Sequence, residues 1–186
     1  MKREDWPEVA SLIYEGTNHW YQSHGMGAIF TGEVKDAELF CEVYEDLDPG
    51  CCILAVEKLS QRIVGSCFFH PRETHISLGI MNVHPDAMGQ KVASRLLAHV
   101  TNIAEKEQKP VRLVSSALNL ASFSLYTRAG FTPRTAYQDM TLSVPEAGID
   151  HAPAGLSRVR KATLADVSKM GALELELNQI SREKDF

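Results

Sequence analysis

VHPDAMGQKVASRLL, residues 83–97, decides the fold of this chain, because it joins a predicted strand to a predicted helix through one short turn. The strand before it is HISLGIMNV at 75–83, and apolar residues recur every three or four positions over 92–103, as in a helix. The turn contains Gly89, and the helix begins near Gln90. The free N–H groups of the first helical turn therefore point beside the end of the strand, where they can hold a diphosphate.

Composition narrows the function classes. The chain has 186 residues, of which 44% are apolar and 23% charged, the usual mix of a globular protein. Its formal charge of -5 argues against a surface that neutralises the phosphates of long nucleic acids. No apolar run of about 18 residues occurs, and the opening residues MKREDWPE are too charged for a signal peptide. We therefore expect a cytoplasmic protein whose partners are small molecules or proteins, with no nucleic acid and no membrane.

The cysteines and histidines form no metal-binding pattern. Adjacent Cys51 and Cys52 are neither a CxxC redox pair nor a metal knuckle, and the other cysteines are Cys41 and Cys67. The seven histidines show no HExxH motif and no zinc spacing with cysteine. We expect reduced structural thiols and no metal.

The remaining periodicities predict an α/β domain. We expect helices at 5–16, 34–45, 91–106 and 120–129, and strands at 51–58, 63–70, 75–83, 111–117 and 134–143. Asp5 is the expected N-cap of the first helix, and Leu39, Phe40 and Val43 are expected to face inward on the second. Short turns join the first three strands, so we expect a mixed, mostly antiparallel central sheet flanked by helices.

A second informative stretch lies at 119–131, with an asparagine at a helix start, a tyrosine two turns later and a glycine stop. Together with the strand-turn-helix before it, this stretch resembles the GNAT superfamily of acyl-CoA-dependent N-acyltransferases. The family signature N-x-x-A-x-x-L-Y-x-[KR]-x-G-F is matched at Asn119, Ser122 (where alanine is usual), Leu125, Tyr126, Arg128, Gly130 and Phe131.

The resemblance implies an enzyme that moves an acetyl group from acetyl-CoA to a primary amine by direct transfer in a ternary complex. It implies that the main chain near Met81 and Val83 pairs with the pantetheine arm of coenzyme A, and that Asn119 lies beside the cofactor. Tyr126 would act as general acid toward the departing thiolate. The pyrophosphate would bind at Met88, Gly89, Gln90, Lys91, Val92 and Ala93.

The phosphate loop departs from the family pattern, which reads Arg/Gln, two residues, Gly, one residue, then Gly or Ala. Met88 removes a donor, and Lys91 stands where glycine lets the backbone approach the phosphates. A Cβ at Lys91 is tolerable if its φ is negative. This departure keeps a second interpretation open, a weak or inactive acyl-CoA-binding or regulatory module, and a third in which the domain serves only for interaction.

The residues that handle the amine are less well defined by the sequence. The base that deprotonates the amine is sought among Glu73, His75 and His84 near the third strand. Aromatic side chains within residues 17–33 (Trp20, Tyr21 and Phe30) are candidates to line the acceptor pocket. The acceptor is expected to be a small-molecule or peptide amine, and a homodimer is left open.

The tail resembles the start of the chain. VRKATLADV at 159–167 aligns with residues 1–9 at a constant offset of 158, and 145–155 has the composition of a linker. We therefore predict a GNAT-like domain at 1–144 and a strand and helix at 156–186. That segment either begins a second copy, so that the chain is a fragment of a tandem protein, or completes the first domain.

Overall fold

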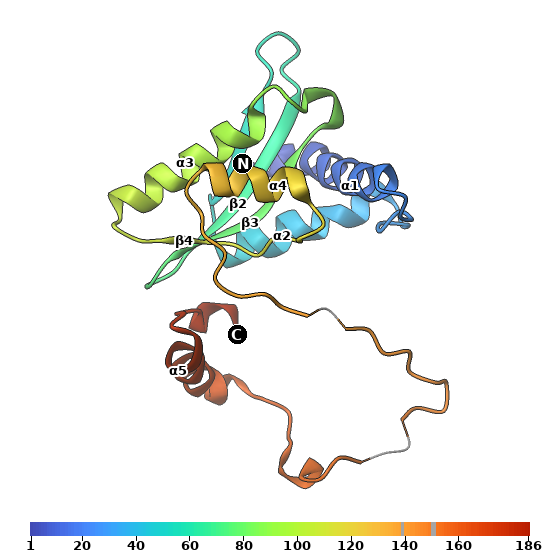
Figure 1. Cartoon of the computed structure of the whole chain (residues 1–186), viewed down its shortest axis with the longest axis vertical. Coiled ribbons are helices and arrows are strands. Elements are labelled where there is room, and N and C mark those ends of the chain that lie inside the picture. The colour runs from blue at the N-terminus through green and yellow to red at the C-terminus, as the bar shows by residue number, and fades with distance from the viewer. Residues whose placement is uncertain (139, 150–151) are drawn as a thin grey trace. The chain divides into compact units, whose positions relative to one another are not determined.

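The computed structural model describes residues 1–138, 140–149 and 152–186 (Figure 1). These residues group into two compact units, one of Met1–Val114 together with Met170–Phe186 and one of Ser115–Lys169. The first unit contains the sheet, and the second contains a further helix, α4.

The helices and strands have the following bounds. The α-helices are α1 (Trp6–Ser23), α2 (Glu38–Leu47), α3 (Val92–Lys106), α4 (Leu120–Arg128) and α5 (Val167–Asn178). The strands are β1 (Cys52–Val56), β2 (Ile63–Pro71), β3 (Ile76–Val83) and β4 (Val111–Arg112). Short 3-10 turns include η1 (Arg3–Asp5), η2 (Val34–Ala37), η3 (Pro85–Ala87), η4 (Leu156–Arg158), η5 (Leu164–Asp166) and η6 (Glu183–Asp185).

The sheet has the order β1-β2-β3-β4 and is mostly antiparallel. Cys67 of β2 pairs with Ile53 of β1 on one side and with Met81 of β3 on the other, both antiparallel. The pairing of β3 with β4 is parallel and spans only Ile76 and Ser77. This is the predicted α/β fold, with a mixed sheet flanked by helices.

Helices cover both faces of β2, which is why eight of its nine residues are buried (Figure 1). On one face, Phe68 packs in a core with Val9 and Ile13 of α1 and Cys41 of α2. On the other face, α3 approaches at Gly65, where a Cβ would lie 2.7 Å from Cγ1 of Val92. The absence of a side chain at Gly65 therefore fixes how close the first turn of α3 comes to the sheet.

The N-terminal helix is longer than the sequence predicts. It continues to Ser23, and Asp5 does not cap it, because the Asp5 carboxylate instead accepts from the Lys2 N–H at 2.6 Å and closes η1. Buried Asn18 accepts from the N–H groups of Ile29 and Phe30 and so folds the following segment back onto the helix. These long-range hydrogen bonds leave no periodic signal.

The inward face of α2 was also predicted wrongly in part. Leu39 and Val43 are exposed, whereas Cys41 is fully buried and Tyr44 packs against Phe68. Phe40 does pack against the core, as expected. The helix is turned so that Cys41, rather than the larger Leu39, fits the space beside α1.

Three predicted strands are shorter or missing. The strand expected at 111–117 is limited to the two residues of β4, and the described residues of 134–143 form no strand, with Asp139 lying outside the described residues. In the tail, the described residues from 152 to 163 contain no strand, although the expected helix is present as α5. A strand is stable only when a neighbour takes up its hydrogen bonds, which sequence alternation alone cannot guarantee. The division into domains at 1–144, 145–155 and 156–186 stays a prediction.

Candidate functional site

The turn between β3 and α3 offers a row of unpaired backbone donors. Gly89 and Lys91 both have left-handed backbones, with φ of 78° and 63°. Within the described residues, no hydrogen bond accounts for the N–H groups of Gly89, Lys91, Val92, Ala93 and Ser94. Such converging donors at a helix N-terminus stabilise a diffuse anion without a cationic side chain. The arrangement fits a diphosphate.

The turn is held firmly to the sheet. The N–H of His84 donates to the carbonyl of Val64 on β2 at 3.0 Å, and the Nδ1 atom of His84 accepts from the N–H of Asp86 at 3.1 Å. Val92 lies against Gly65 at the other end of the turn. The donor groups are therefore positioned before any ligand binds.

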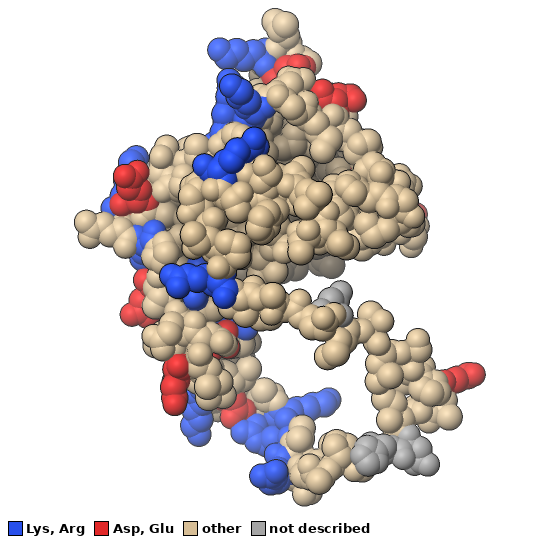
Figure 2. All heavy atoms as spheres, in the orientation of Figure 1, with Lys and Arg blue, Asp and Glu red and all other residues tan. Residues whose placement is uncertain are grey.

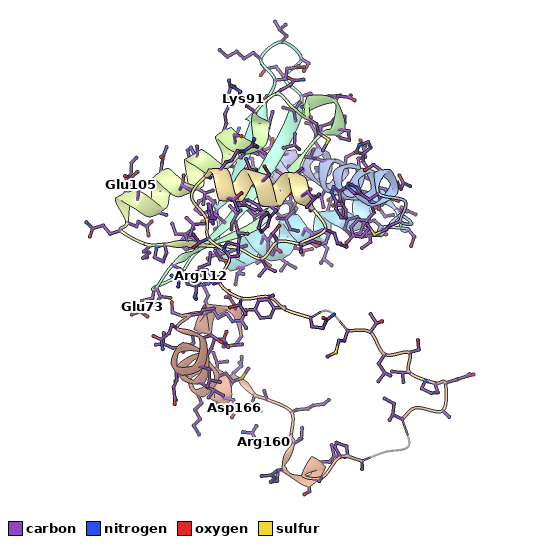
Figure 3. The ribbon with its side chains drawn as sticks, viewed as in Figure 1. Glu73, Lys91, Glu105, Arg112, Arg160 and Asp166 are labelled. Atoms are coloured by element: carbon purple, nitrogen blue, oxygen red, sulfur yellow. The ribbon has the colours of Figure 1, made fainter. Side chains whose placement is uncertain are left out.

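Lys91 does not have the negative φ at which its side chain would be tolerated. A negative φ would have made its side chain harmless, but the residue is left-handed, the conformation for which glycine is suited. Lys and Arg side chains occupy the end of the first unit that holds Lys91 (Figures 2 and 3). Met88, beside it, is 54% exposed. The backbone cradle is thus present, and both cationic and acidic side chains lie at this end of the unit.

The edge of β3 beyond β4 is the second feature expected of a coenzyme A site. Met81 and Val83 pair with Cys67 and Gly65 of β2 through one edge of the strand. In the part of the chain that the structure describes, no strand pairs with the opposite edge from Leu78 to Val83. An extended arm can add to such an edge as a further strand. The pairing of Met81 and Val83 with pantetheine stays a prediction.

The second unit contains the predicted signature helix, α4. Oδ1 of Asn119 accepts from the N–H of Ser122 at 3.0 Å and caps the helix. Gly130 ends it with a φ of 91°, and the Phe131 N–H donates to the carbonyl of Tyr126 at 3.0 Å. The rings of Tyr126 and Phe131 lie 5.8 Å apart. Asn119 thus has a structural task, and its contact with the cofactor and the acid role of Tyr126 stay predictions.

The base candidates named from the sequence are poorly suited to the task. Glu73 is exposed in the turn between β2 and β3, away from the end of β3 that leads to Lys91 (Figure 3). Burial lowers the pKa of His75, and the cations of Arg112 and Arg72 lower it further. Nδ1 of His84 accepts from the N–H of Asp86, and its Nε2 lies 3.5 Å from Oε2 of Glu15. Both ring nitrogens of His84 therefore already have polar neighbours.

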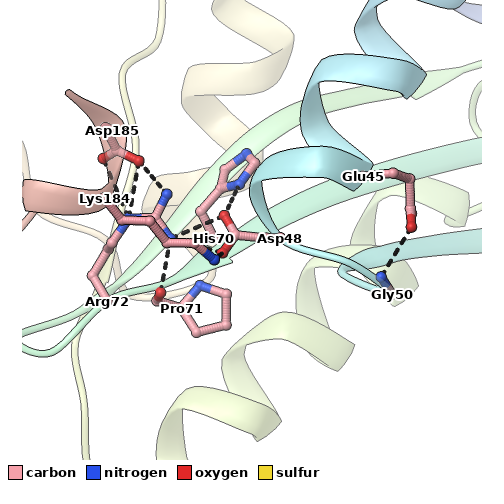
Figure 4. A network of polar contacts seen from close by, with 8 residues as sticks. All are labelled: Glu45, Asp48, Gly50, His70, Pro71, Arg72, Lys184 and Asp185. Atoms are coloured by element: carbon pink, nitrogen blue, oxygen red, sulfur yellow. Dashed lines mark hydrogen bonds and ion pairs between the residues drawn. The ribbon is translucent and has the colours of Figure 1, made fainter. Parts of the chain in front are cut away.

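A buried acid–base cluster, which the sequence did not reveal, lies on the α1 and α2 face of the sheet (Figure 4). Asp48, at the end of α2, accepts from Nδ1 of His70 at 2.7 Å, from Nη1 of Arg72 at 2.9 Å and from Nζ of Lys184 at 2.8 Å. Nε of Arg72 also donates to Asp185 at 3.1 Å. The cluster joins three separate parts of the first unit.

The charges of this cluster balance each other. Burial raises the pKa of Asp48, but hydrogen bonds from Lys184, His70 and Arg72 outweigh it and hold the pKa below its usual value. Burial likewise lowers the pKa of Arg72, and its pairs with Asp185 and Asp48 bring about a net rise. Both groups are therefore charged near neutral pH.

A hollow of about 290 Å³ opens beside the cluster. It is lined by Tyr44, Leu47, His70, Arg72, Ser77, Leu78, Gly79 and Asp185. The aromatic residues Trp20 and Phe30, expected to line the acceptor pocket, have other contacts, because Trp20 stacks on His24 and Phe30 packs against Tyr14. No pattern in the sequence connects Asp48, which precedes a Pro-Gly turn, with His70 at the end of a strand.

Comparison with known proteins agrees with this geometry. The sequence profile of the acetyltransferase (GNAT) family matches residues 13–131. The chain belongs to the GNAT family. This match spans the turn at Lys91, the β3 edge and helix α4, so all the expected coenzyme A contacts lie within it. No curated protein sequence matches the chain.

Solved structures share the GNAT fold at low identity. A Pyrococcus horikoshii protein described as an acetyltransferase has a TM-score of 0.58 and 18% identity over 72% of this chain, which spans only 42% of that protein. A GNAT acetyltransferase of Staphylococcus aureus Mu50 has a TM-score of 0.57 and 16% identity over 70% of this chain and 80% of its own. The ribosomal-protein-S18-alanine N-acetyltransferase of Escherichia coli has a TM-score of 0.52 and 18% identity, over 73% of this chain and 76% of its own.

The described residues contain neither a membrane-spanning helix nor a metal-binding cluster. No helix among residues 1–138, 140–149 and 152–186 has the length and apolar character needed to cross a membrane. The same residues contain no group of three or more His, Cys, Asp or Glu side chains arranged to hold a metal ion.

Proposed function

We propose that this GNAT protein transfers an acetyl group from acetyl-CoA to a primary amine by direct attack in a ternary complex. The observation that carries the proposal is the set of unpaired N–H groups at Gly89 and Lys91–Ser94 beside the open edge of β3. Acetyl-CoA, when bound, supplies an activated thioester. No nucleophile of the protein has to form a covalent intermediate.

Each part of the chain has one task in this proposal. The amides of Gly89, Lys91, Val92 and Ala93 hold the diphosphate, and the neighbouring Met88 and Gln90 flank it. Main-chain groups of Met81 and Val83 align the pantetheine arm. Asn119 lies beside the cofactor, and Tyr126 donates a proton to the sulfur as it leaves, because its phenol is a weak enough acid to hold that proton until then.

Binding and turnover test the proposal separately. Isothermal titration with acetyl-CoA and with CoA measures the cradle, and release of free thiol over a panel of primary amines measures transfer. Replacing Ala93 by leucine should weaken CoA binding by crowding the helix terminus, whereas the same change at exposed Ala98 on α3 should not. Equal affinity of the two variants would show that the cradle is assigned wrongly.

A second function is supported by one observation. Lys91 is left-handed and places a side chain where the family has glycine. If this side chain obstructs the diphosphate, the protein is a regulatory acyl-CoA-binding module with little or no activity. Binding of acetyl-CoA without turnover on any amine would favour the module, and no heat of binding at millimolar ligand would favour a domain that serves only for interaction.

The setting of the activity completes the proposal. We place the enzyme in the cytoplasm and take its acceptor to be a small molecule or a peptide, with no nucleic acid and no membrane as partner. Size-exclusion chromatography with light scattering would decide between a monomer and a homodimer, and cell fractionation would test the location.

A further inference from the structure

We propose that His70, oriented by Asp48, is the general base that deprotonates the acceptor amine, and that the hollow beside it is the acceptor site. This inference rests on the proposed acetyl transfer and adds to it the residue that the sequence could not supply. The acceptor class is a primary amine on a short, partly apolar arm, because Tyr44, Leu47 and Leu78 line the hollow together with the hydroxyl of Ser77.

The ring of His70 is oriented for this task. Its Nδ1 atom lies 2.7 Å from Oδ2 of Asp48, and since that carboxylate is ionised, Nδ1 carries the hydrogen and donates it. In the neutral ring, Nε2 therefore keeps its lone pair. His70 is only 8% exposed, and in the described residues Nε2 has no hydrogen-bond partner. A buried ring nitrogen that has a free lone pair and lies at a hollow can accept a proton from a molecule bound there.

Gly79 keeps that nitrogen accessible. A Cβ at Gly79 would lie 2.9 Å from Nε2 of His70 and 3.2 Å from the carbonyl oxygen of Phe68, so any side chain there would cover the ring. Gly79 belongs to the stretch of β3 that has no strand on its outer edge. The free nitrogen thus faces the strand along which the pantetheine arm is proposed to run.

The charged and titratable neighbours of His70 are few and paired. From α2, Asp48 faces Nδ1, and the ring of Tyr44 lies 4.8 Å from the imidazole. Arg72 and Lys184 are both bound to Asp48, and Asp185 is bound to Arg72. Since each cation has a carboxylate partner, none is left to repel an incoming ammonium group.

The proton and bond changes balance. Nε2 of His70 takes one proton from the ammonium form of the acceptor, and the freed nitrogen lone pair forms the C–N bond to the acetyl carbon as the C–S bond breaks. Tyr126 donates its proton to the departing sulfur, and the second proton that the nitrogen then loses replaces the one that the phenol gave up. The imidazolium returns its proton to solvent, and an N-substituted acetamide and a free thiol remain.

His70→Gln removes the basic nitrogen of His70 and still fills part of the space of the ring. His99→Gln, at an exposed position on α3, is the matched control. We expect kcat/KM at pH 7 to fall by about 10²- to 10⁴-fold in His70→Gln, the range for loss of general base catalysis, with unchanged CoA affinity. The loss should shrink as the pH nears the amine's own pKa of about 10.4, because the free amine then needs no base. His99→Gln should behave as wild type.

The variant Asp48→Asn distinguishes a role of Asp48 in positioning His70 from a role in stabilising the fold. The amide oxygen can still accept from Nδ1, but the negative charge is lost, so the pKa that governs kcat/KM should move to lower pH. A variant in which only folding is affected would lose activity without moving that pKa. Thermal unfolding of each variant identifies any that fail to fold.

A readout that needs no turnover completes the test. Nitrogen-15 NMR of the histidine rings should show His70 as the Nδ1–H tautomer, and titration with n-butylamine should shift its Nε2 resonance in a saturable manner. If wild type acetylates amines and His70→Gln does so equally well, the inference is overturned while the proposed function stands. If wild type neither binds CoA nor acetylates any amine, the proposed function fails. The NMR titration alone then decides whether the hollow binds an amine, and an unshifted Nε2 resonance would overturn the inference.

Discussion

Replacing Lys91 by glycine should make the protein more stable. Lys91 has a φ of 63° at the start of α3, and a residue with a Cβ pays roughly 1–2 kcal/mol for this left-handed conformation. Glycine removes that cost but loses more chain entropy on folding, by roughly 0.5–1 kcal/mol. The side chain of Lys91 is exposed and forms no ion pair within the described residues, so little else changes. The net gain is about 0.5–1 kcal/mol.

Thermal and urea unfolding can measure a gain of this size. For a domain of about 150–250 residues, 1 kcal/mol corresponds to roughly 2–4 °C in Tm, so Lys91→Gly should raise Tm by about 1–4 °C. Lys91→Ala is the control, because it removes the same charge and keeps the Cβ. If Lys91→Gly is no more stable than Lys91→Ala, the left-handed strain at this position is not real. The claim that the turn keeps its shape in spite of the lysine at position 91 would then need other support.

Four further predictions concern the rest of the chain. Tyr126→Phe should lower turnover by roughly 10- to 1000-fold with little change in CoA affinity, and unchanged turnover in the thiol-release assay would exclude its acid role. Asn119→Ala should reduce the helicity seen by circular dichroism and cost about 1 kcal/mol, since it removes the cap of α4. The pKa of Asp48 is lowered in the folded protein, so its charged form stabilises the fold at pH values above the usual carboxyl pKa of about 3.9. This contribution is lost as the pH falls through the lowered pKa. The difference in unfolding free energy between wild type and Asp48→Asn should therefore shrink in acid. Burial raises the pKa of three thiols to about 12, so a thiol reagent at pH 8 should label Cys51 before any of Cys41, Cys52 and Cys67, and equal rates would contradict their burial.

Local patterns predicted the elements that local forces decide. The strand 75–83, the helix from 91 and the glycine stop at Gly130 are all present, because periodicity, turn residues and caps act over a few positions. The turn that offers its amides was predicted for the same reason. The elements predicted wrongly are those that depend on distant partners. Asn18, in the part of α1 that was not predicted, bonds the backbone of Ile29, and β4 pairs with β3 only at Ile76 and Ser77.

The candidate site divides in the same way. The cradle at 88–93 is contiguous in sequence, so its donors could be predicted. The cluster around Asp48 could not be, since His70 lies 22 residues away and Lys184 lies 136 residues away. Its members meet only because β2 places His70 on the face covered by α2 and because the segment after α5 returns to the sheet. Chemistry assembled from separate segments leaves no motif.

The left-handed conformation of Lys91 bears on the choice between enzyme and binding module. The backbone takes the conformation suited to glycine although lysine stands there, so the surrounding fold, and not the residue, sets the shape of the turn. The contact of Val92 with Gly65 and the anchoring of His84 to Val64 supply that constraint. The backbone donors are therefore kept in place, and only the direction of the Lys91 side chain distinguishes the two functions. If the ammonium group lies over the diphosphate it adds attraction, and high salt should then weaken CoA binding by wild type more than by Lys91→Gly.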